Sequence, residues 1–174
     1  MSVSIKDVVI KDACILFDLI DMGLMDSFYK LDLTVVTTPE VIDEITDETQ
    51  RTEVNRYIST GALQIDEFGV FETIASIIAA NPGLSFTDGS VIELATRRNA
   101  AILSSDKSLR NESERRQLTV RGMLWILLEL HRQEIITREV LLKKLDLYPA
   151  INKRAPKTEI EKLIKKLTEQ EREP

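Results

Sequence analysis

With 174 residues, of which 43% are hydrophobic and 30% charged, the chain is long enough to bury one core and has the composition of a globular domain. Its net charge of −6 argues against a protein that coats DNA nonspecifically, and its single cysteine excludes an internal disulfide and a multi-cysteine metal site. Charged residues near the start and the lack of an apolar run of about 18 residues predict neither a signal peptide nor a membrane span, so we expect a cytoplasmic protein.

Strand and helix patterns alternate along the chain. A first strand is predicted at 7–11, and helices follow at 13–22 and 25–30. A second strand at 33–37 leads into a helix that Thr38 and Pro39 open, and helical sequence continues to about residue 57. The later predicted elements are a strand at 62–66, helices at 68–80 and 85–98, a strand at 101–104, a helix at 107–116, a strand at 118–120, and helices at 122–133, 137–145 and 158–170.

Short strands that alternate with helices predict an α/β fold, in which a mostly parallel sheet is covered by helices on both faces. We assign residues 1–150 to this domain and residues 151–174 to a C-terminal amphipathic helix. That helix has a capping box at Thr158 and Glu161, followed by an apolar stripe. It is expected to pack on its own domain, with docking to a partner protein as the alternative.

Four carboxylates fall where parallel strands are predicted to end. Asp12 follows the first strand, Asp106 follows the strand at 101–104, Asp88 lies in the first turn of the helix at 85–98, and Glu44 lies in the helix after the second strand. Parallel sheets bind ligands beyond the carboxyl ends of their strands. The alternative for the three aspartates is capping of helix N-termini, and for Glu44 an exposed position on a helix.

If these four side chains converge, their repulsion has to be relieved. Two carboxylates about 5 Å apart repel by roughly 3 kcal/mol at an effective dielectric constant of about 20, so such a site takes up protons or cations. Oxygen ligands suit Mg²⁺ or Mn²⁺ rather than zinc. Because these ions neutralise charge that develops on a phosphoryl group, hydrolysis of a phosphodiester is the natural reaction for this site.

Positive charge is concentrated in residues 97–121. This segment has seven basic and three acidic residues, so it carries +4 and the rest of the chain −10. It could hold a nucleic-acid backbone beside the acidic site, the alternative being a solvated face of two helices. The candidate contacts to nucleic acid are Lys107, Arg110, Arg115 and Arg116.

Four segments surround the carboxylates: VIKDACILF at 9–17, TPEVIDEI at 38–45, LSFTDGSVIELA at 84–95 and ILSSDKSL at 102–109. In this order they resemble the motifs of the PIN-domain nucleases, over about residues 7 to 130. The acidic residues of that family then fall on Asp12, Glu44, Asp88 and Asp106. The helix that begins at Gly122 resembles a less characterised PIN-like subgroup.

The resemblance implies a Rossmann-like three-layer α/β/α sandwich and a divalent-metal-dependent ribonuclease. Asp12, Asp88 and Asp106 would hold Mg²⁺ or Mn²⁺, with Glu44 completing the catalytic cluster and the hydroxyls of Ser104 and Ser105 supporting Asp106. Many members of the family are VapC-type toxins of toxin–antitoxin pairs and form dimers. The implied partners are therefore RNA, a small antitoxin protein and a second copy of the chain.

Several residues qualify this assignment. Cys14 occupies a position where the family often has Ser, Thr or Asn, and a thiol is a weak donor; its apolar neighbours predict that it is buried. Asp43 is the rival of Glu44, since only one of two adjacent helix positions points inward. Glu93 and Glu40 are further candidate acids near the site.

Two other interpretations remain beside the ribonuclease. The first is a non-catalytic PIN-like module that binds RNA or protein, and Cys14 favours it. The second is an aspartate-based phosphatase, which Cys14 disfavours because that chemistry needs a second aspartate at position 14. His131, the single histidine, lies on an apolar helix beyond the last strand and is not expected to be catalytic.

Overall fold

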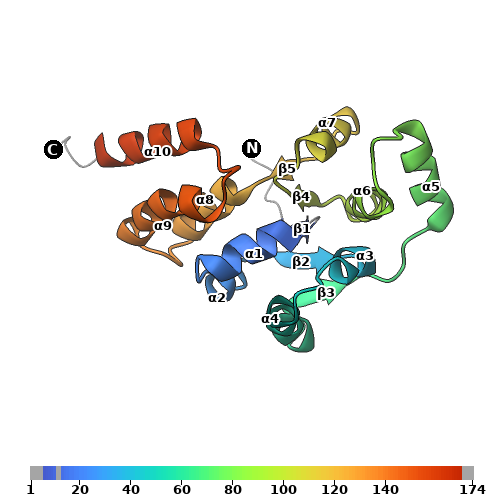
Figure 1. Cartoon of the computed structure of the whole chain (residues 1–174), viewed down its shortest axis with the longest axis horizontal. Helices are drawn as coiled ribbons and strands as arrows, with labels where there is room; N and C mark the ends of the chain where they lie inside the picture. The colour runs from blue at the N-terminus through green and yellow to red at the C-terminus, as the bar shows by residue number, and fades with distance from the viewer. Residues whose placement is uncertain (1–5, 11–12, 170–174) are drawn as a thin grey trace. The chain divides into compact units, whose positions relative to one another are not determined.

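The computed structural model describes residues 6–10 and 13–169, so Asp12 lies outside the described residues. The strands are β1 (Asp7–Ile10), β2 (Thr34–Thr37), β3 (Leu63–Ile65), β4 (Ala101–Leu103) and β5 (Val120–Arg121) (Figure 1). The helices are α1 (Ala13–Asp21), α2 (Met25–Phe28), α3 (Pro39–Asp43), α4 (Glu48–Ser59), α5 (Phe71–Ala80), α6 (Phe86–Arg98), α7 (Lys107–Arg115), α8 (Met123–Arg132), α9 (Arg138–Ile151) and α10 (Lys157–Glu169).

The five strands form one parallel sheet in the order β3-β2-β1-β4-β5. β1 lies at its centre, where Val9 is paired with Val36 on one side and with Ile102 on the other. All three of these side chains are completely buried. Apolar β-branched residues therefore form the middle of the sheet, as expected for parallel strands that are covered on both faces.

The strand order reverses at β1, and this reversal places helices on both faces of the sheet. Because parallel crossovers are right-handed, α3 and α4 on the way to β3 lie on one face, whereas α6 and α7 around β4 lie on the other. α6 packs on β1 and β4, and α5 packs on α6. The predicted three-layer α/β fold with a parallel central sheet is confirmed. Its switch point lies between β1 and β4, where this class of fold binds ligands.

Gly89 allows α5 to approach α6 closely. A Cβ atom at this position would lie 3.0 Å from Cγ1 of Ile78 and 3.1 Å from Cγ2 of Ile74, so a larger side chain would force these α5 side chains to shift. The glycine next to Asp88 thus serves the packing of two helices.

The chain folds as two compact units. The first takes in the described residues up to Phe17 and the segment Asp32–Gly122, which includes the whole sheet. The second takes in Asp18–Leu31 and the described residues from Met123 onward, and it is helical. The domain boundary expected at residue 150 stays a prediction.

A buried carboxylate organises the second unit. Asp18 is 6% exposed and accepts hydrogen bonds from Nδ2 of Asn152 at 2.9 Å and from the hydroxyl of Tyr148 at 3.3 Å. These contacts reach the end of α9, which runs to Ile151 with Pro149 inside it, whereas the sequence predicted a helix only to 145. The helix continues because its last turn is tied to Asp18, and a proline so near the end removes few helical hydrogen bonds. α10 packs on α9.

Two other boundaries differ from the prediction. α5 begins at Phe71 rather than 68, because the carboxylate of Asp66 accepts a hydrogen bond from the backbone N–H of Phe68 at 3.1 Å and holds that residue in a turn. β5 begins at Val120 rather than 118, since the N–H of Leu118 bonds to Ser113 O at 2.8 Å and belongs to the turn that ends α7. Among the described residues, no helix is long and apolar enough to cross a bilayer.

Candidate functional site

The carboxyl ends of the central strands are tied together by hydroxyl groups. The buried Thr37, the last residue of β2, donates its hydroxyl hydrogen bond to the carbonyl of Ile10 at 2.9 Å, at the end of β1. Thr38 follows, and its Oγ1 lies 3.0 Å from the Oγ of Ser90 in α6. α6 is separated from β4 by two residues, so its C-terminus lies at the amino edge of the sheet and its first turn lies toward the carboxyl edge. The predicted site is therefore bounded by β1, β2, β4 and the start of α6.

Asp106 is held firmly at this edge. It is the N-cap of α7, and its Oδ1 accepts hydrogen bonds from the N–H groups of Ser108 at 2.8 Å and Leu109 at 3.3 Å. The completely buried Ser104 accepts a hydrogen bond from the N–H of Asp106 at 3.0 Å through its Oγ. Ser105 is exposed. The predicted supporting role of Ser104 has a geometric basis, because its hydroxyl shapes the turn that presents Asp106.

Asp88 lies in the first turn of α6. Its Oδ2 accepts a hydrogen bond from the N–H of Ser85 at 2.8 Å, while its own N–H donates to the Oγ of Ser85 at 3.0 Å. This reciprocal pair is a capping box. The sequence suggested both capping and metal binding for Asp88, and capping engages one carboxylate oxygen at the carboxyl edge of the sheet.

Glu44 is placed by the short helix α3. Thr38 caps the start of this helix and Pro39 occupies its first turn, as predicted, while Val41 and Ile42 face the interior. Glu44 is the C-cap, with φ −71° and ψ −15°, and is exposed. Its rival Asp43 is exposed as well, so burial does not indicate which of the two belongs to the site.

Asp12, the first aspartate of the predicted site, lies outside the described residues. Among the residues that the structure describes, no group of three or more His, Cys, Asp or Glu side chains is arranged to hold a metal ion. The donors that the structure does place at the carboxyl edge, Asp88 and Asp106, are carboxylates, which fit a hard divalent cation such as Mg²⁺ or Mn²⁺.

Cys14 is exposed, so the prediction of a buried thiol is wrong. It is the second residue of α1, where its side chain reaches solvent although its neighbours Ala13 and Ile15 are buried.

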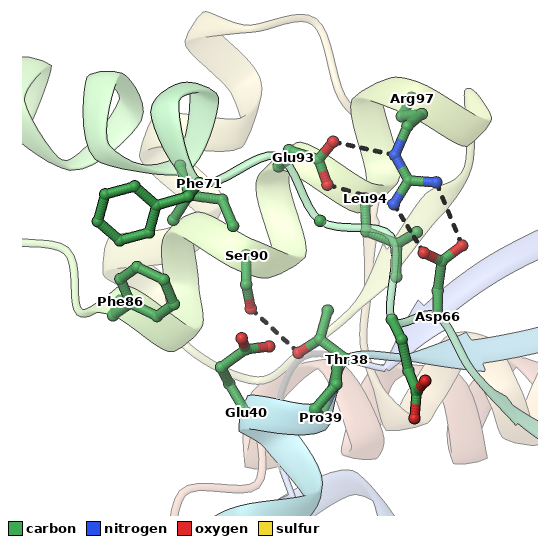
Figure 2. A pocket seen from close by; sticks show the side chains of 13 residues that line it. Thr38, Pro39, Glu40, Asp66, Phe71, Phe86, Ser90, Glu93, Leu94 and Arg97 are labelled. Atoms are coloured by element: carbon green, nitrogen blue, oxygen red, sulfur yellow. Dashed lines mark hydrogen bonds and ion pairs between the residues drawn. The ribbon is translucent and has the colours of Figure 1, made fainter.

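Beside the predicted site is a pocket of about 170 Å³ (Figure 2). Two of the carboxylates that line it, those of Asp66 and Glu93, bind the same arginine, Arg97. Arg97 donates to Asp66 at 2.8 and 3.2 Å and to Glu93 at 2.9 and 3.3 Å. Arg98 also donates to Asp66, at 3.0 Å. Both carboxylates are buried, Asp66 at 6% and Glu93 at 4% exposure. This network fixes the β3–α5 connection to α6.

The hydrogen bonds from Arg97 lower the pKa of Asp66 from 3.8 to about 2, against the opposing effect of burial. The two carboxylates in turn raise the pKa of Arg97 above its ordinary value. Glu93 and Glu40, two candidate acids from the sequence, both line this pocket, whereas Asp66 was not predicted. The available signal was an aspartate directly after the third strand.

The basic segment at 97–121 is largely paired within the protein. Arg97 and Arg98 bind Asp66, and Arg115 and Arg116 bind the buried Glu112 at 3.1 and 2.8 Å. A hydrogen bond from Asn81 and then one from Arg116 lower the pKa of Glu112. Three basic residues of the segment form no ion pair with a described residue, and all three are exposed: Lys107, Arg110 and Arg121.

His131 belongs to α8 in the second unit. Its Nδ1 is 3.2 Å from the carbonyl oxygen of Ile136, in the turn that follows α8. This contact gives the histidine a structural role at the end of its helix, as the sequence suggested.

Comparison with known proteins gives a family and a fold. A family model described as a PIN domain matches residues 8–169. No curated protein matches the chain. Among solved structures, the crystal structure of PAE2754 from Pyrobaculum aerophilum is similar, with a TM-score of 0.55 and 15% sequence identity over 76% of this chain and 100% of that chain. At this identity the likeness concerns the fold.

Proposed function

The chain belongs to the PIN-domain family, and from this premise we propose that it is a divalent-metal-dependent ribonuclease. PIN domains are generally nucleases that use divalent metals. The observation that supports the proposal most is that aspartates of the family motifs stand at one edge of the sheet, Asp106 at the end of β4 and Asp88 at the start of α6. Asp12, two residues beyond the end of β1, is proposed as the third metal ligand.

The described residues suit this role because their positions are rigid. The N–H groups of α7 and the hydroxyl of Ser104 hold Asp106, and the capping box holds Asp88. Preorganised ligands of this kind lose little entropy when a cation binds. Bound Mg²⁺ or Mn²⁺ would supply Lewis acidity toward the phosphate, and Glu44 would complete the acidic cluster.

Lys107 and Arg110 are proposed to hold the RNA backbone. They lie in the first turns of α7, directly after Asp106, and form no ion pair with a described residue. Arg115 and Arg116 were also predicted contacts, but their partner Glu112 offsets their charge. We therefore assign the larger share of the electrostatic attraction to the first pair.

A finer proposal is that the enzyme is the toxin of a type II toxin–antitoxin pair, acting in the cytoplasm as a homodimer with a small antitoxin as partner. It rests on the resemblance of the four motifs. A neighbouring reading frame for a small DNA-binding protein, together with growth arrest on expression that co-expression of this neighbour relieves, would support it. Unimpeded growth on expression of the active nuclease would contradict it.

The competing function is a PIN-like module that binds RNA or protein without cleaving it. Two observations favour it: Cys14 replaces the usual hydroxyl or amide donor, and Asp88 and Asp106 both cap helices. Calorimetric titration with Mn²⁺ separates the two functions. The ribonuclease should bind Mn²⁺ and lose binding in Asp12→Asn, with the exposed Asp146→Asn as matched control. No Mn²⁺ binding at millimolar concentration would favour the module.

A further inference from the structure

An exposed aromatic patch lies beside the pocket in the first unit. It comprises Phe71 and Phe86, which are 65% and 40% exposed, together with Phe68 and Val70 in the segment just before Phe71, which are 82% and 44% exposed. The rings of Phe71 and Phe86 lie with their centroids 5.9 Å apart at an interplanar angle of 34°, one from the start of α5 and one from the start of α6 (Figure 2). Large apolar side chains that gather on a surface, rimmed by polar residues, mark a place where another molecule binds.

These aromatic side chains are not needed to fix the segment that carries them. The β3–α5 connection is attached to α6 by the ion pairs of Asp66 with Arg97 and Arg98, and α5 is attached by its buried residues Ile74 and Ile77. The rings are therefore presented to solvent on a rigid support. Such preorganisation favours binding because little side-chain entropy is lost.

Acidic residues surround the patch. Glu40 and Glu67 line the pocket and Glu72 follows Phe71 in the first turn of α5. None of the three forms an ion pair with a described residue, whereas the buried Asp66 and Glu93 are neutralised by arginines. The patch and its pocket therefore present aromatic rings and uncompensated negative charge together.

We propose that this patch binds a polypeptide segment of another protein, in which an arginine is flanked by apolar residues. The planar guanidinium stacks on aromatic faces and also pairs with carboxylates. The arginine would enter the pocket between Phe71 and Glu40, and its apolar neighbours would cover Phe68. This docking surface goes beyond the proposed nuclease activity and does not depend on it.

Charge selects this occupant over two others. An RNA backbone would bring phosphates toward Glu40, Glu67 and Glu72, which repel them. A second copy of the chain, related by a two-fold axis through the patch, would bring the same carboxylates against one another. A basic segment with apolar residues can pair with the carboxylates and also pack against the aromatic rings.

The test uses the full chain and a phage library of random 12-residue peptides. We expect selection on the wild-type protein, with counter-selection on Phe71→Ala, to enrich peptides that combine arginine with apolar residues. In fluorescence anisotropy, Phe71→Ala should lower the affinity for an enriched peptide about tenfold or more. Glu67→Gln should weaken it several-fold at low salt and less at high salt. The control Leu147→Ala removes an exposed apolar side chain from α9, 41% accessible, and should leave binding unchanged.

Four results would overturn the proposal. The first is that no peptide is enriched, and the second is that the enriched peptides lack basic residues or bind Phe71→Ala as tightly as wild type. The third is self-association of the wild-type chain in sedimentation experiments that Phe68→Ser abolishes, which would assign the patch to a second copy. The fourth is binding of a 12-nucleotide RNA that Phe71→Ala abolishes, which would assign it to nucleic acid.

Discussion

Replacing Asp66 with asparagine should destabilise the protein in a way that depends on pH. Asp66 is 6% exposed and accepts hydrogen bonds from Arg97, Arg98 and the N–H of Phe68. Asparagine has nearly the same shape but no charge, and its NH2 group cannot accept the hydrogen bonds of an arginine. It leaves two arginines on α6 without their shared partner.

The magnitude follows from the pKa of Asp66, which the folded protein lowers from 3.8 to about 2. At about 1.36 kcal/mol for each pKa unit, this difference corresponds to roughly 2 kcal/mol of folding free energy. Because the folded pKa is the lower one, the contribution is complete at neutral pH and is lost as the pH falls from about 5 to 2. At pH 3 roughly half of it should remain.

The assay is urea unfolding followed by circular dichroism at pH 7, 5, 3 and 2, for wild type, Asp66→Asn and the exposed control Asp146→Asn. Carboxylates that do not share Arg97 or Arg98 with Asp66 titrate alike in all three proteins, so the difference in free energy of unfolding reports chiefly on Asp66 and its arginine partners. We expect it to be roughly 2 kcal/mol at pH 7 and to approach zero at pH 2. An equal difference at both pH values, or none at pH 7, would refute this reasoning.

Three further predictions concern individual side chains. Glu112→Gln should lower the free energy of unfolding at pH 7 by about 2 kcal/mol in urea unfolding, because a buried charged acceptor of three donors is lost. Glu44→Gln should slow RNA cleavage by about 100-fold or more while Asp43→Asn changes it little, and the reverse order would assign the role to Asp43. Lys107→Ala and Arg110→Ala should each reduce the salt dependence of RNA binding by about one unit of slope; an unchanged slope would place the RNA elsewhere.

The centre of the sheet could be predicted from the sequence because β1 and β2 are short β-branched runs flanked by strong helix signals. Thr38 with Pro39, and Ser85 with Asp88, mark helix starts that the structure reproduces. The boundaries that failed depended on contacts between distant residues. The extension of α9 through Pro149 requires the bond from Asn152 to Asp18, which is 134 positions away in the chain.

The candidate site was predictable only in part. Position at strand ends and motif order located Asp88 and Asp106, but local pattern cannot tell whether a carboxylate at a helix start only caps that helix or also binds a ligand. The pairing of Arg97 with Asp66 could not be predicted either, because it joins residues 31 positions apart. Four arginines of the basic segment are paired with buried carboxylates, so they contribute less to binding of nucleic acid than the sequence suggested.

The cleavage rate of a labelled RNA pool, measured against Mn²⁺ concentration for wild type and Asp12→Asn purified in the same way, tests the central claim most directly. We expect cleavage by the wild-type protein that saturates with Mn²⁺ and stops in EDTA, and a loss of at least about 100-fold in Asp12→Asn without a change in the free energy of unfolding. Cleavage by Asp12→Asn at the wild-type rate, or cleavage that persists in EDTA, would contradict a nuclease that works through this acidic cluster.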